Sequence, residues 1–306
     1  MDELVKILSS GEVHKVVVLV GAGISVASGI PDFRSPKVGL YASIKDTATL
    51  HNKSATFVFQ MEVFMKDPRP FWWIFCKMWP KTAQALPTPF HFFIKLLDYN
   101  NLLLRCYSQN VDGLEKLAGL SSEKVINAHG VMDICHCLDC GQEYPISFCM
   151  KQVMKNINDP NTSIEDTVVP ICIKCKSNHI KPDMVFFHEY LPNLFFEQYP
   201  IDLNEADLLI VAGTSLEVYP FASLPKKVNP NTKRFVITNR PKNLSMFKFK
   251  SQRDWLIEGD CQEIVEQICF KLGWSNELNS MIKNRVTIGT QWIKEENETS
   301  STKSTT

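Results

Sequence analysis

The stretch that most constrains the fold is residues 16–35, which reads VVVLVGAGISVASGIPDFRS. Its first five residues are apolar and four are valine, a pattern typical of a strand buried on both faces of a parallel sheet. Gly21 and Gly23 follow at once, and glycine lets the backbone turn sharply and approach a ligand closely. A strand, a glycine turn and a helix start, whose free N–H groups favour phosphate, together predict a nucleotide site.

The glycines alone do not specify the kind of nucleotide. The dinucleotide fingerprint G-x-G-x-x-G is incomplete, because Val26 stands where its third glycine would be. A plain tight turn between a strand and a helix remains an alternative on this evidence. Directly after the turn, however, Asp32, Phe33 and Arg34 place an acid, an aromatic ring and a guanidinium side by side. A loop without a binding role has little use for that combination.

Further along the chain, short apolar runs alternate with helical patterns. Strands are predicted at residues 16–20, 102–106, 124–127, 208–212, 234–238 and 254–257. Helices are predicted at residues 4–8, 55–65, 70–79, 89–99, 112–118, 260–272 and 276–283. This alternation predicts an α/β fold with a parallel sheet. Polar clusters follow five of the strands (GAGIS, SQN-D, NAH-G, GTS and TNR), and ligands of such sheets bind beyond the carboxyl ends of the strands.

Composition excludes several classes of partner. The chain has 306 residues, a formal net charge of zero and a pI of about 7.0, so there is no global basic field and we expect no direct nucleic-acid binding. No apolar run approaches the roughly 18 to 20 residues of a membrane helix, so no membrane partner is expected. The N-terminus lacks the apolar block of a secretory signal and the basic character of a mitochondrial presequence. A reducing cytosolic or nuclear location is therefore expected.

Four of the ten cysteines form two C-x-x-C pairs, Cys137 with Cys140 and Cys172 with Cys175. Four thiolates are the tetrahedral set that zinc prefers, and four protein ligands leave no open position, so one structural zinc ion is predicted. Cys135 or His136 could replace one ligand, although the C-x-x-C spacing favours Cys137. Five single cysteines in apolar surroundings are read as small buried hydrophobes: Cys76, Cys106, Cys149, Cys261 and Cys269.

The predicted helices at 55–65 and 70–79 are rich in aromatic residues. Core packing explains such residues most simply, and the alternative is a wall for an apolar part of a substrate. Residues 37–53, which precede these helices, are mixed in character and are expected to form a mobile loop. The last residues of the chain, EENETSSTKSTT, are poor in apolar side chains and are expected to be disordered.

With these motifs in view, the chain resembles the sirtuins, the NAD-dependent protein deacylases. The segments GAGISVASGIPDFRSP, SQNVDGLEKLAG, NAHG, KPDMVFFHEYLP, ADLLIVAGTSLEVYPF and TNR occur in the order of that family, as do the two C-x-x-C pairs. The resemblance covers roughly residues 13–282. The run LLLRCYSQNVDGLEKLAGL and the closing GDC and LGW look most like the cytosolic branch that deacetylates tubulin and histones.

The resemblance implies a discontinuous domain organisation. A Rossmann-like NAD-binding domain, with helices on both faces of its sheet, would comprise residues 1–38, 89–130 and 183–285. A smaller helical and zinc-binding domain would comprise residues 39–88 and 131–182. Residues 286–306 would form a disordered tail. The active cleft of the family lies between the two domains.

The resemblance also implies site residues. Those expected to contact NAD are Ala22, Gly23, Ile24, Ser25, Val26, Asp32, Phe33, Arg34, Gln109, Asn110, Asp112, Thr214, Ser215, Asn239, Arg240 and Cys261. Asn110 and His129 would be catalytic. Read by itself, a lone histidine is more often structural, but His129 follows a predicted strand and precedes a glycine, and its ordinary pKa of about 6.5 suits a general base.

The implied reaction consumes NAD as a co-substrate. The acyl oxygen of an acyl-lysine attacks C1′ of the nicotinamide ribose, and His129 then draws a proton from the ribose hydroxyls. The products are free lysine, nicotinamide and O-acyl-ADP-ribose. The substrate backbone would add as a strand between residues 185–189 and 215–218. The substrate residues implied in this way are Val185, Phe186, Phe187, His188, Glu189, Glu217 and Val218.

Three positions depart from the pattern of the family. His188 replaces a usual glycine where substrate backbone should approach, so its side chain either points to solvent or changes peptide affinity. Val26 replaces a usual serine or threonine, so one hydroxyl contact to phosphate is lost. Glu217 stands where glutamine is common and could favour basic substrates. The stretch 71–79 lacks the Tyr-x-x-Arg pair of the desuccinylating branch, which favours acetyl or longer fatty acyl groups.

Two other functions remain open at this point. A mono-ADP-ribosyltransferase shares the first chemical step and would label a protein target without an acyl-lysine. An NAD-sensing scaffold without catalysis is a third reading, which the presence of both His129 and Asn110 disfavours. The expected partners are proteins that carry acylated lysines, of the histone or tubulin kind.

Overall fold

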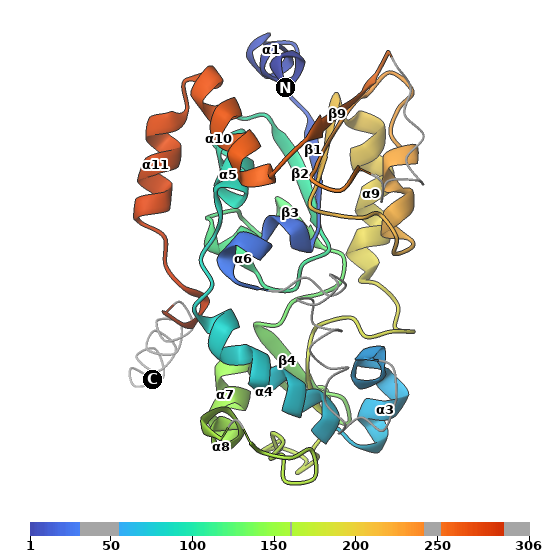
Figure 1. Ribbon diagram of the computed structural model, residues 1–306. Coiled ribbons are helices and arrows are strands. Elements are labelled where there is room, and N and C mark those ends of the chain that lie inside the picture. Colours follow the sequence, from blue (N-terminus) through green and yellow to red (C-terminus); the bar gives the residue numbers. More distant parts are fainter. Residues whose placement is uncertain (31–54, 160, 242–251, 291–306) are drawn as a thin grey trace, which may run out of the picture.

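The computed structural model describes residues 1–30, 55–159, 161–241 and 252–290. Its centre is a six-stranded sheet in the order β3-β2-β1-β7-β8-β9, in which every neighbouring pair is parallel (Figure 1). The strands are β1 (Val16–Val20), β2 (Leu103–Ser108), β3 (Val125–Asn127), β7 (Leu208–Ala212), β8 (Lys233–Thr238) and β9 (Asp254–Glu258). Numbered within the sheet this is the order 3-2-1-4-5-6, the doubly wound arrangement of dinucleotide-binding domains. The predicted α/β fold is confirmed.

Both faces of the sheet are covered. On one face lie α1 (Asp2–Ser9), α5 (Pro89–Tyr99), α10 (Cys261–Leu272) and α11 (Ser275–Lys283), and a short α6 (Leu114–Leu117) packs against α5. On the other face lie α9 (Asn193–Glu205) and the 3₁₀ turn η5 (Phe221–Lys226) (Figure 1). The apolar side chains divide accordingly, because successive residues of a strand point to opposite faces. Val16, Val18 and Val20 belong to the first core, while Val17 and Leu19 belong to the second.

A second unit lies below the sheet in Figure 1 and is built from two separate excursions of the chain. The first comprises η4 (Ala55–Phe59), α3 (Met61–Lys66) and α4 (Arg69–Ala83). The second comprises β4 (Ile134–Cys137), β5 (Glu143–Pro145), α7 (Ile146–Gln152), α8 (Met154–Asn158) and β6 (Ile180–Pro182). The two excursions share one core, in which α4 packs against α8. The predicted helical and zinc-binding unit is thus present beside the sheet, while the exact domain boundaries stay a prediction.

Aromatic side chains hold this second unit together. Phe71 and Trp72 of α4 are buried, and Trp72 Nε1 donates a hydrogen bond to the Ile180 carbonyl oxygen at 3.2 Å. Phe186 inserts between Phe64 and Phe71, with ring centroids 5.7 Å and 5.0 Å away. Core packing is therefore the main role of the aromatic helices.

The structure corrects several expectations. The strand β4 pairs antiparallel with β5 and β6, although no strand was expected in residues 133–183. The helix α9 was also not expected. Residues 286–290 are not disordered, since Ile288 is 3% exposed and its N–H donates to the Ala85 carbonyl oxygen. The expected loop at 37–53 and the rest of the expected tail lie outside the described residues. No helix in the described ranges is long and apolar enough to cross a membrane.

Candidate functional site

The loops that follow β1 and β7 meet where the strand order of the sheet reverses. The N–H of Gly23 donates to the carbonyl oxygen of Gly213 at 2.8 Å, so the two backbones touch. A Cβ on Gly23 would lie 2.6 Å from the Gly213 Cα, and one on Gly213 would lie 2.5 Å from the Ile24 nitrogen. Gly213 also has a φ of +64°. Glycine is therefore required on both sides for steric reasons. Two short 3₁₀ turns, η1 (Ala22–Ile24) and η2 (Val26–Ser28), take the place of the expected helix.

The end of β2 is tied to both of these loops. The Gln109 N–H donates to the Val20 carbonyl oxygen at 3.0 Å, and Thr214 Oγ1 donates to Gln109 Oε1 at 2.5 Å. Asn110 is 4% exposed, and its side-chain amide donates to the Gly21 carbonyl oxygen at 3.3 Å. The polar residues predicted at three strand ends thus form one continuous hydrogen-bonded edge.

A short polar chain runs from Asn110 to Asp112. Asn110 Nδ2 donates to Ser25 Oγ at 3.3 Å, and the Ser25 hydroxyl hydrogen-bonds the carboxylate of Asp112. Asp112 also accepts from the Leu114 N–H at 3.0 Å. Burial raises the pKa of Asp112, and the hydrogen bonds from Leu114 and Ser25 partly oppose that shift. These three side chains come from two loops and line one pocket.

His129 follows β3 and is half-buried. Its Nδ1 lies 3.0 Å from the backbone carbonyl oxygen of Gln109, and its ring faces Phe221 at a centroid distance of 6.4 Å. Burial lowers the pKa of His129, and the bond to Gln109 partly offsets that effect. The imidazole is therefore neutral near pH 7, with Nε2 available to accept a proton. Gly130 next to it must be glycine, because any Cβ would collide with the Asp183 carbonyl oxygen.

A pocket extends from this edge toward α4. Its polar end is formed by Ala22, Ser25, Asn110 and Asp112. Its apolar end is formed by Ile30, Phe59, Ile74, Phe75, Met78, Trp79, Val111, Met132 and Met184, with Thr82 among them. Some of the aromatic residues of α4 thus form a pocket wall as well as a core.

The segment expected to receive substrate backbone is anchored from both sides. The Val185 N–H donates to the His129 carbonyl oxygen at 2.8 Å, and the Phe187 N–H donates to the Phe59 carbonyl oxygen at 2.8 Å. The Glu189 carboxylate accepts from the Phe186 N–H at 2.6 Å and lies 3.2 Å from Lys181 Nζ. Lys181 is 5% exposed, so this ion pair is buried and fixes the turn.

The side chains of the expected substrate residues have different surroundings. Phe186 is 2% exposed within the aromatic core, whereas Phe187 is 37% exposed. His188 and Glu217 are exposed, and Val185 and Val218 are half-buried. His188 has a φ of +71°, the left-handed region that favours glycine. This backbone geometry explains why a glycine fits this position.

Ser215, which follows β7, is half-buried. Three other residues expected to contact NAD lie at the ends of β8 and β9: Asn239 and Arg240 are exposed, and Cys261 begins α10. The Asp260 side chain caps α10 by accepting from the N–H groups of Gln262 and Glu263. Val26 is 49% exposed at the glycine loop. Asp32, Phe33 and Arg34 lie outside the described residues.

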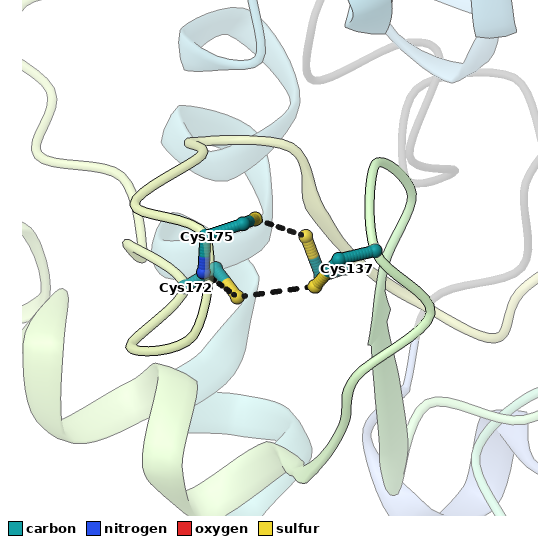
Figure 2. A group of neighbouring side chains, drawn as sticks. Cys137, Cys172 and Cys175 are labelled. Atoms are coloured by element: carbon teal, nitrogen blue, oxygen red, sulfur yellow. Dashed lines mark hydrogen bonds between the residues drawn. The ribbon is translucent and has the colours of Figure 1, made fainter.

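The four paired cysteines converge at the tip of the second unit. Their sulfur atoms lie within 4.8 Å of one another, with Cys137 Sγ 3.5 Å from Cys175 Sγ and Cys140 Sγ 3.6 Å from Cys172 Sγ. Figure 2 shows the side chains of Cys137, Cys172 and Cys175 turned toward one another. The donor set and its spread suit one tetrahedral zinc ion, as predicted.

A tyrosine supports this metal centre. Tyr144 OH accepts a hydrogen bond from the Ile173 N–H and lies 3.1 Å from Cys172 Sγ, to which it donates. Burial would raise the pKa of Cys172, but hydrogen bonds from Tyr144 and the Cys175 backbone lower it to about 6, which favours the thiolate.

The alternative ligands have other partners. Cys135 is fully buried in the core of the second unit, and His136 Nδ1 lies 2.7 Å from Asp183 Oδ1. The single cysteines are buried, as expected: Cys76, Cys106, Cys149, Cys261 and Cys269.

Several supporting residues had no signal in the sequence. Gln262 donates to the Ile24 carbonyl oxygen at 3.0 Å and accepts from the Phe90 N–H at 2.9 Å, which joins the glycine loop to α5. Thr88 Oγ1 donates to the same carbonyl at 3.0 Å. Ser108 accepts from the Asn110 N–H and donates to the buried Glu115. The contacts of Gln262 and Thr88 join residues far apart in the chain, so no local motif predicts them.

Comparison with known proteins agrees with this geometry. Residues 21–220 match the model of the Sir2 family. The chain is 36% identical over 92% of its length to the NAD-dependent protein deacetylase sirtuin-2 of Danio rerio, of which it covers 74%. It is 38% identical over 96% of its length to the NAD-dependent protein deacetylase hst2 of Schizosaccharomyces pombe, of which it covers 82%. It is 40% identical over 87% of its length to HST2 of Candida albicans, of which it covers 75%. The doubly wound sheet, the four-cysteine centre and these matches together show that the chain belongs to the Sir2 family.

Proposed function

We propose that this protein is an NAD-dependent protein-lysine deacetylase, which releases nicotinamide and transfers the acetyl group from lysine to ADP-ribose. The observation that carries the proposal is the position of His129. Its Nδ1 is held by the backbone carbonyl oxygen of Gln109, the residue before Asn110, so its Nε2 can act as a base. The names of the relatives, NAD-dependent protein deacetylases, support the same activity.

Three groups of residues bind different parts of NAD in this proposal. The glycine loop 21–25 and Thr214 with Ser215 contact the phosphates. Asn110, Ser25 and Asp112 face the nicotinamide and its ribose. Asn239, Arg240 and the backbone at Cys261 receive the adenosine. NAD supplies the electrophilic ribose carbon, and His129 removes a proton from the ribose hydroxyls once the acyl oxygen has attacked.

The peptide is proposed to add as a strand between residues 185–189 and 215–218. Both flanking segments carry half-buried side chains, and the first is fixed by its bonds to His129 and Phe59. Backbone pairing of this kind binds many sequences, because it reads the main chain and leaves specificity to the alternate side chains. Acetyl or longer fatty acyl groups suit the apolar wall formed by α4 better than acidic ones do.

The proposed targets and cellular location follow from the branch of the family that the chain resembles. We infer that the natural targets are acetylated tails of the histone or tubulin kind, in the cytosol or nucleus. A direct comparison of kcat/KM for histone-derived and tubulin-derived acetyl-lysine peptides distinguishes the two targets. Equal kcat/KM for both peptides and for an unrelated acetylated sequence would contradict either preference.

The function itself is tested by nicotinamide release from NAD with and without an acetyl-lysine peptide. The wild type should release nicotinamide only when the peptide is present, and His129→Ala should lose product formation by roughly 100-fold or more. His14→Ala is the matched control, since His14 is exposed and lies outside the cleft. Label transferred from NAD to a protein without any acyl-lysine would instead support mono-ADP-ribosyl transfer. Binding of NAD without turnover would support the scaffold reading.

A further inference from the structure

Behind the polar end of the pocket lies a fully buried cluster of three ionisable side chains. His91 of α5 and Glu115 of α6 are both 0% exposed, and Asp112 is 9% exposed. One nitrogen or carboxylate oxygen from each lies within 4.8 Å of the others. Asp112 lines the pocket, whereas His91 and Glu115 lie behind it and belong to none of the residues expected to touch NAD.

Two atoms of this cluster have no hydrogen-bond partner among the described residues, namely His91 Nε2 and Glu115 Oε2. Buried polar atoms are almost always hydrogen-bonded, so two orphans in one cluster indicate a shared ligand. Atoms that all lie within 4.8 Å of one another are close enough for one water to bridge them. Such a water needs two to four polar partners, and His91, Asp112 and Glu115 supply three.

The tautomer of His91 indicates whether the cluster can bind a water molecule or a metal ion. His91 Nδ1 lies 3.2 Å from the Thr88 backbone N–H and 2.8 Å from Thr88 Oγ1, and because a backbone N–H can only donate, these contacts favour the tautomer in which Nδ1 accepts. Burial lowers the pKa of His91 to about 3, so the ring is neutral and its single proton lies on Nε2. A protonated Nε2 can donate to a water or a carboxylate, but it offers no lone pair to a metal.

The two carboxyl groups have one proton between them. Glu115 Oε1 accepts from Ser108 Oγ at 2.6 Å, which leaves Oε2 to face the cluster. Burial, with the neighbouring charge of Asp112 as a further cause, raises the pKa of Glu115 to about 8, and burial also raises the pKa of Asp112. Two carboxylates in one dry site cannot both be ionised cheaply, so the pair binds one proton near pH 7.

The surrounding ionisable groups do not neutralise the negative charge of the cluster. Lys95 of α5 pairs with Asp98 at 2.7 Å, and Lys116 of α6 pairs with Asp133 at 3.2 Å. The Cys106 thiol of β2 also faces Glu115, and burial raises its pKa well above the ordinary value, so it stays neutral. The Cys261 thiol of α10 has a pKa raised to about 12, mainly by burial, and faces the Gly23 carbonyl oxygen. Ser25 and Thr88, from the adjoining loops, do not ionise.

We propose that Asp112 and Glu115 share one proton, that one buried water joins them to His91, and that this proton keeps Asp112 and Asn110 placed for NAD binding. Asn110 is linked to the cluster twice, through Ser108 to Glu115 and through Ser25 to Asp112. Loss of the proton places a second negative charge behind a pocket that must accept an anionic dinucleotide. Affinity for NAD should then fall as pH rises. His91 and Glu115 are positioning residues in this proposal, which rests on the proposed function.

Direct measurement of NAD binding by calorimetry across pH tests the proposal. With the pair losing its proton at about pH 8, the Kd of the wild type should rise roughly tenfold between about pH 7 and pH 9. Glu115→Gln keeps the acceptor for Ser108 but cannot ionise, so its Kd should stay flat over this range. Glu12→Gln, which changes an exposed carboxylate, should keep the rise seen in the wild type. A rise that persists in Glu115→Gln would overturn the proposal.

Infrared spectroscopy of the wild type keeps the test independent of whether Glu115→Gln folds. A carbonyl stretch from a protonated carboxyl group should be present near pH 7 and disappear as the pH passes about 8. The absence of that band, or a second bound metal beyond the one zinc in elemental analysis, would count against the cluster. If the wild type binds no NAD at any pH, the proposed function fails, while the infrared band still reports on the shared proton.

Discussion

The Nδ1 atom of His129 lies 3.0 Å from the backbone carbonyl oxygen of Gln109. A carbonyl oxygen can only accept a hydrogen bond, so the proton of the neutral imidazole is on Nδ1 and the lone pair is on Nε2. Gln109 is in turn held by Thr214 and by the end of β1. The orientation and tautomer of the candidate base are thus set by the edge of the sheet.

The first prediction concerns the pH profile of deacetylation. Burial lowers the pKa of His129 below its ordinary value of 6.5, and the base is active only when neutral. Activity should therefore be retained as the pH falls to 6.5 and be lost only below it, when kcat/KM for the peptide is measured against pH. His129→Ala should show no such limb. An acid limb centred at or above 6.5 would contradict the assigned role.

The second prediction concerns zinc. Tyr144 donates to Cys172 Sγ, so Tyr144→Phe removes a bond that favours the thiolate and should weaken zinc affinity by roughly 10- to 100-fold. Competition with a coloured chelator measures the change. Complete removal of zinc should also lower the Tm and abolish activity, because the four thiolates join residues 137–140 to residues 172–175 within the second excursion. Tyr99→Phe is the control, since Tyr99 is 68% exposed and far from the sulfur atoms in sequence. Equal zinc affinity in Tyr144→Phe and wild type would refute the supporting role.

The third prediction concerns His188, whose φ is +71°. An L-residue with a side chain is strained in the left-handed region, so His188→Gly should stabilise the fold by about 1 kcal/mol. Urea denaturation measures this gain. His188→Ala keeps the backbone strain and removes the imidazole, so it should give no comparable gain.

The same pair of variants tests the effect of this position on the substrate. His188→Gly should alter the KM for peptide more than the KM for NAD, because residues 185–189 are the expected peptide edge. If His188→Ala reproduces the change, the imidazole is its cause, and if only His188→Gly does so, the backbone is. Equal effects on both KM values, or none, would speak against any contact with the peptide.

The fourth prediction compares two glycines that both have positive φ. A Cβ added to Gly213 (φ +64°) would lie 2.5 Å from the Ile24 nitrogen, whereas one added to Gly273 (φ +77°) would have nothing within 4 Å. Gly273→Ala should cost about 1 kcal/mol of unfolding free energy, from the backbone alone. Gly213→Ala should lower the unfolding free energy by clearly more than this. It should also weaken NAD binding, because the loops that follow β1 and β7 must separate. Similar losses in the two variants would show that the close approach is unimportant.

The strands of the large sheet could be predicted from the sequence because burial on both faces leaves an uninterrupted apolar run. Residues 16–20 and 208–212 were predicted with the bounds that the structure has. The helix α9 was missed, since Pro200 lies within it and its apolar residues follow no clear helical period. Packing of Phe195 and Leu203 against the second face of the sheet stabilises it, which is a tertiary effect. The strands β4 to β6 have only three or four residues each, too few for a pattern.

The residues of the candidate site also divide into those that the sequence predicted and those that only the structure identified. The polar clusters at the strand ends predicted that GAGIS, SQN, NAH and GTS would meet, because parallel strands end at one edge. The pairing of the cysteines also followed from spacing alone. The structure was needed to separate Cys137 from Cys135 and His136: alternation along β4 turns His136 away from both cysteines, and only the folded structure brings Cys137, and not Cys135, to the other three paired sulfur atoms.

The sequence by itself determined the α/β fold with a parallel sheet, the thiolate centre and the family, because each depends on local patterns of apolar residues, glycines and paired cysteines. Only the tertiary structure placed His91 beside Asp112 and Glu115, and only it assigned a proton to Nδ1 of His129. Those facts depend on distances between residues that lie far apart in the chain and on their removal from water. Burial and the geometry of hydrogen bonds, which set pKa values and tautomers, exist only once the chain has folded.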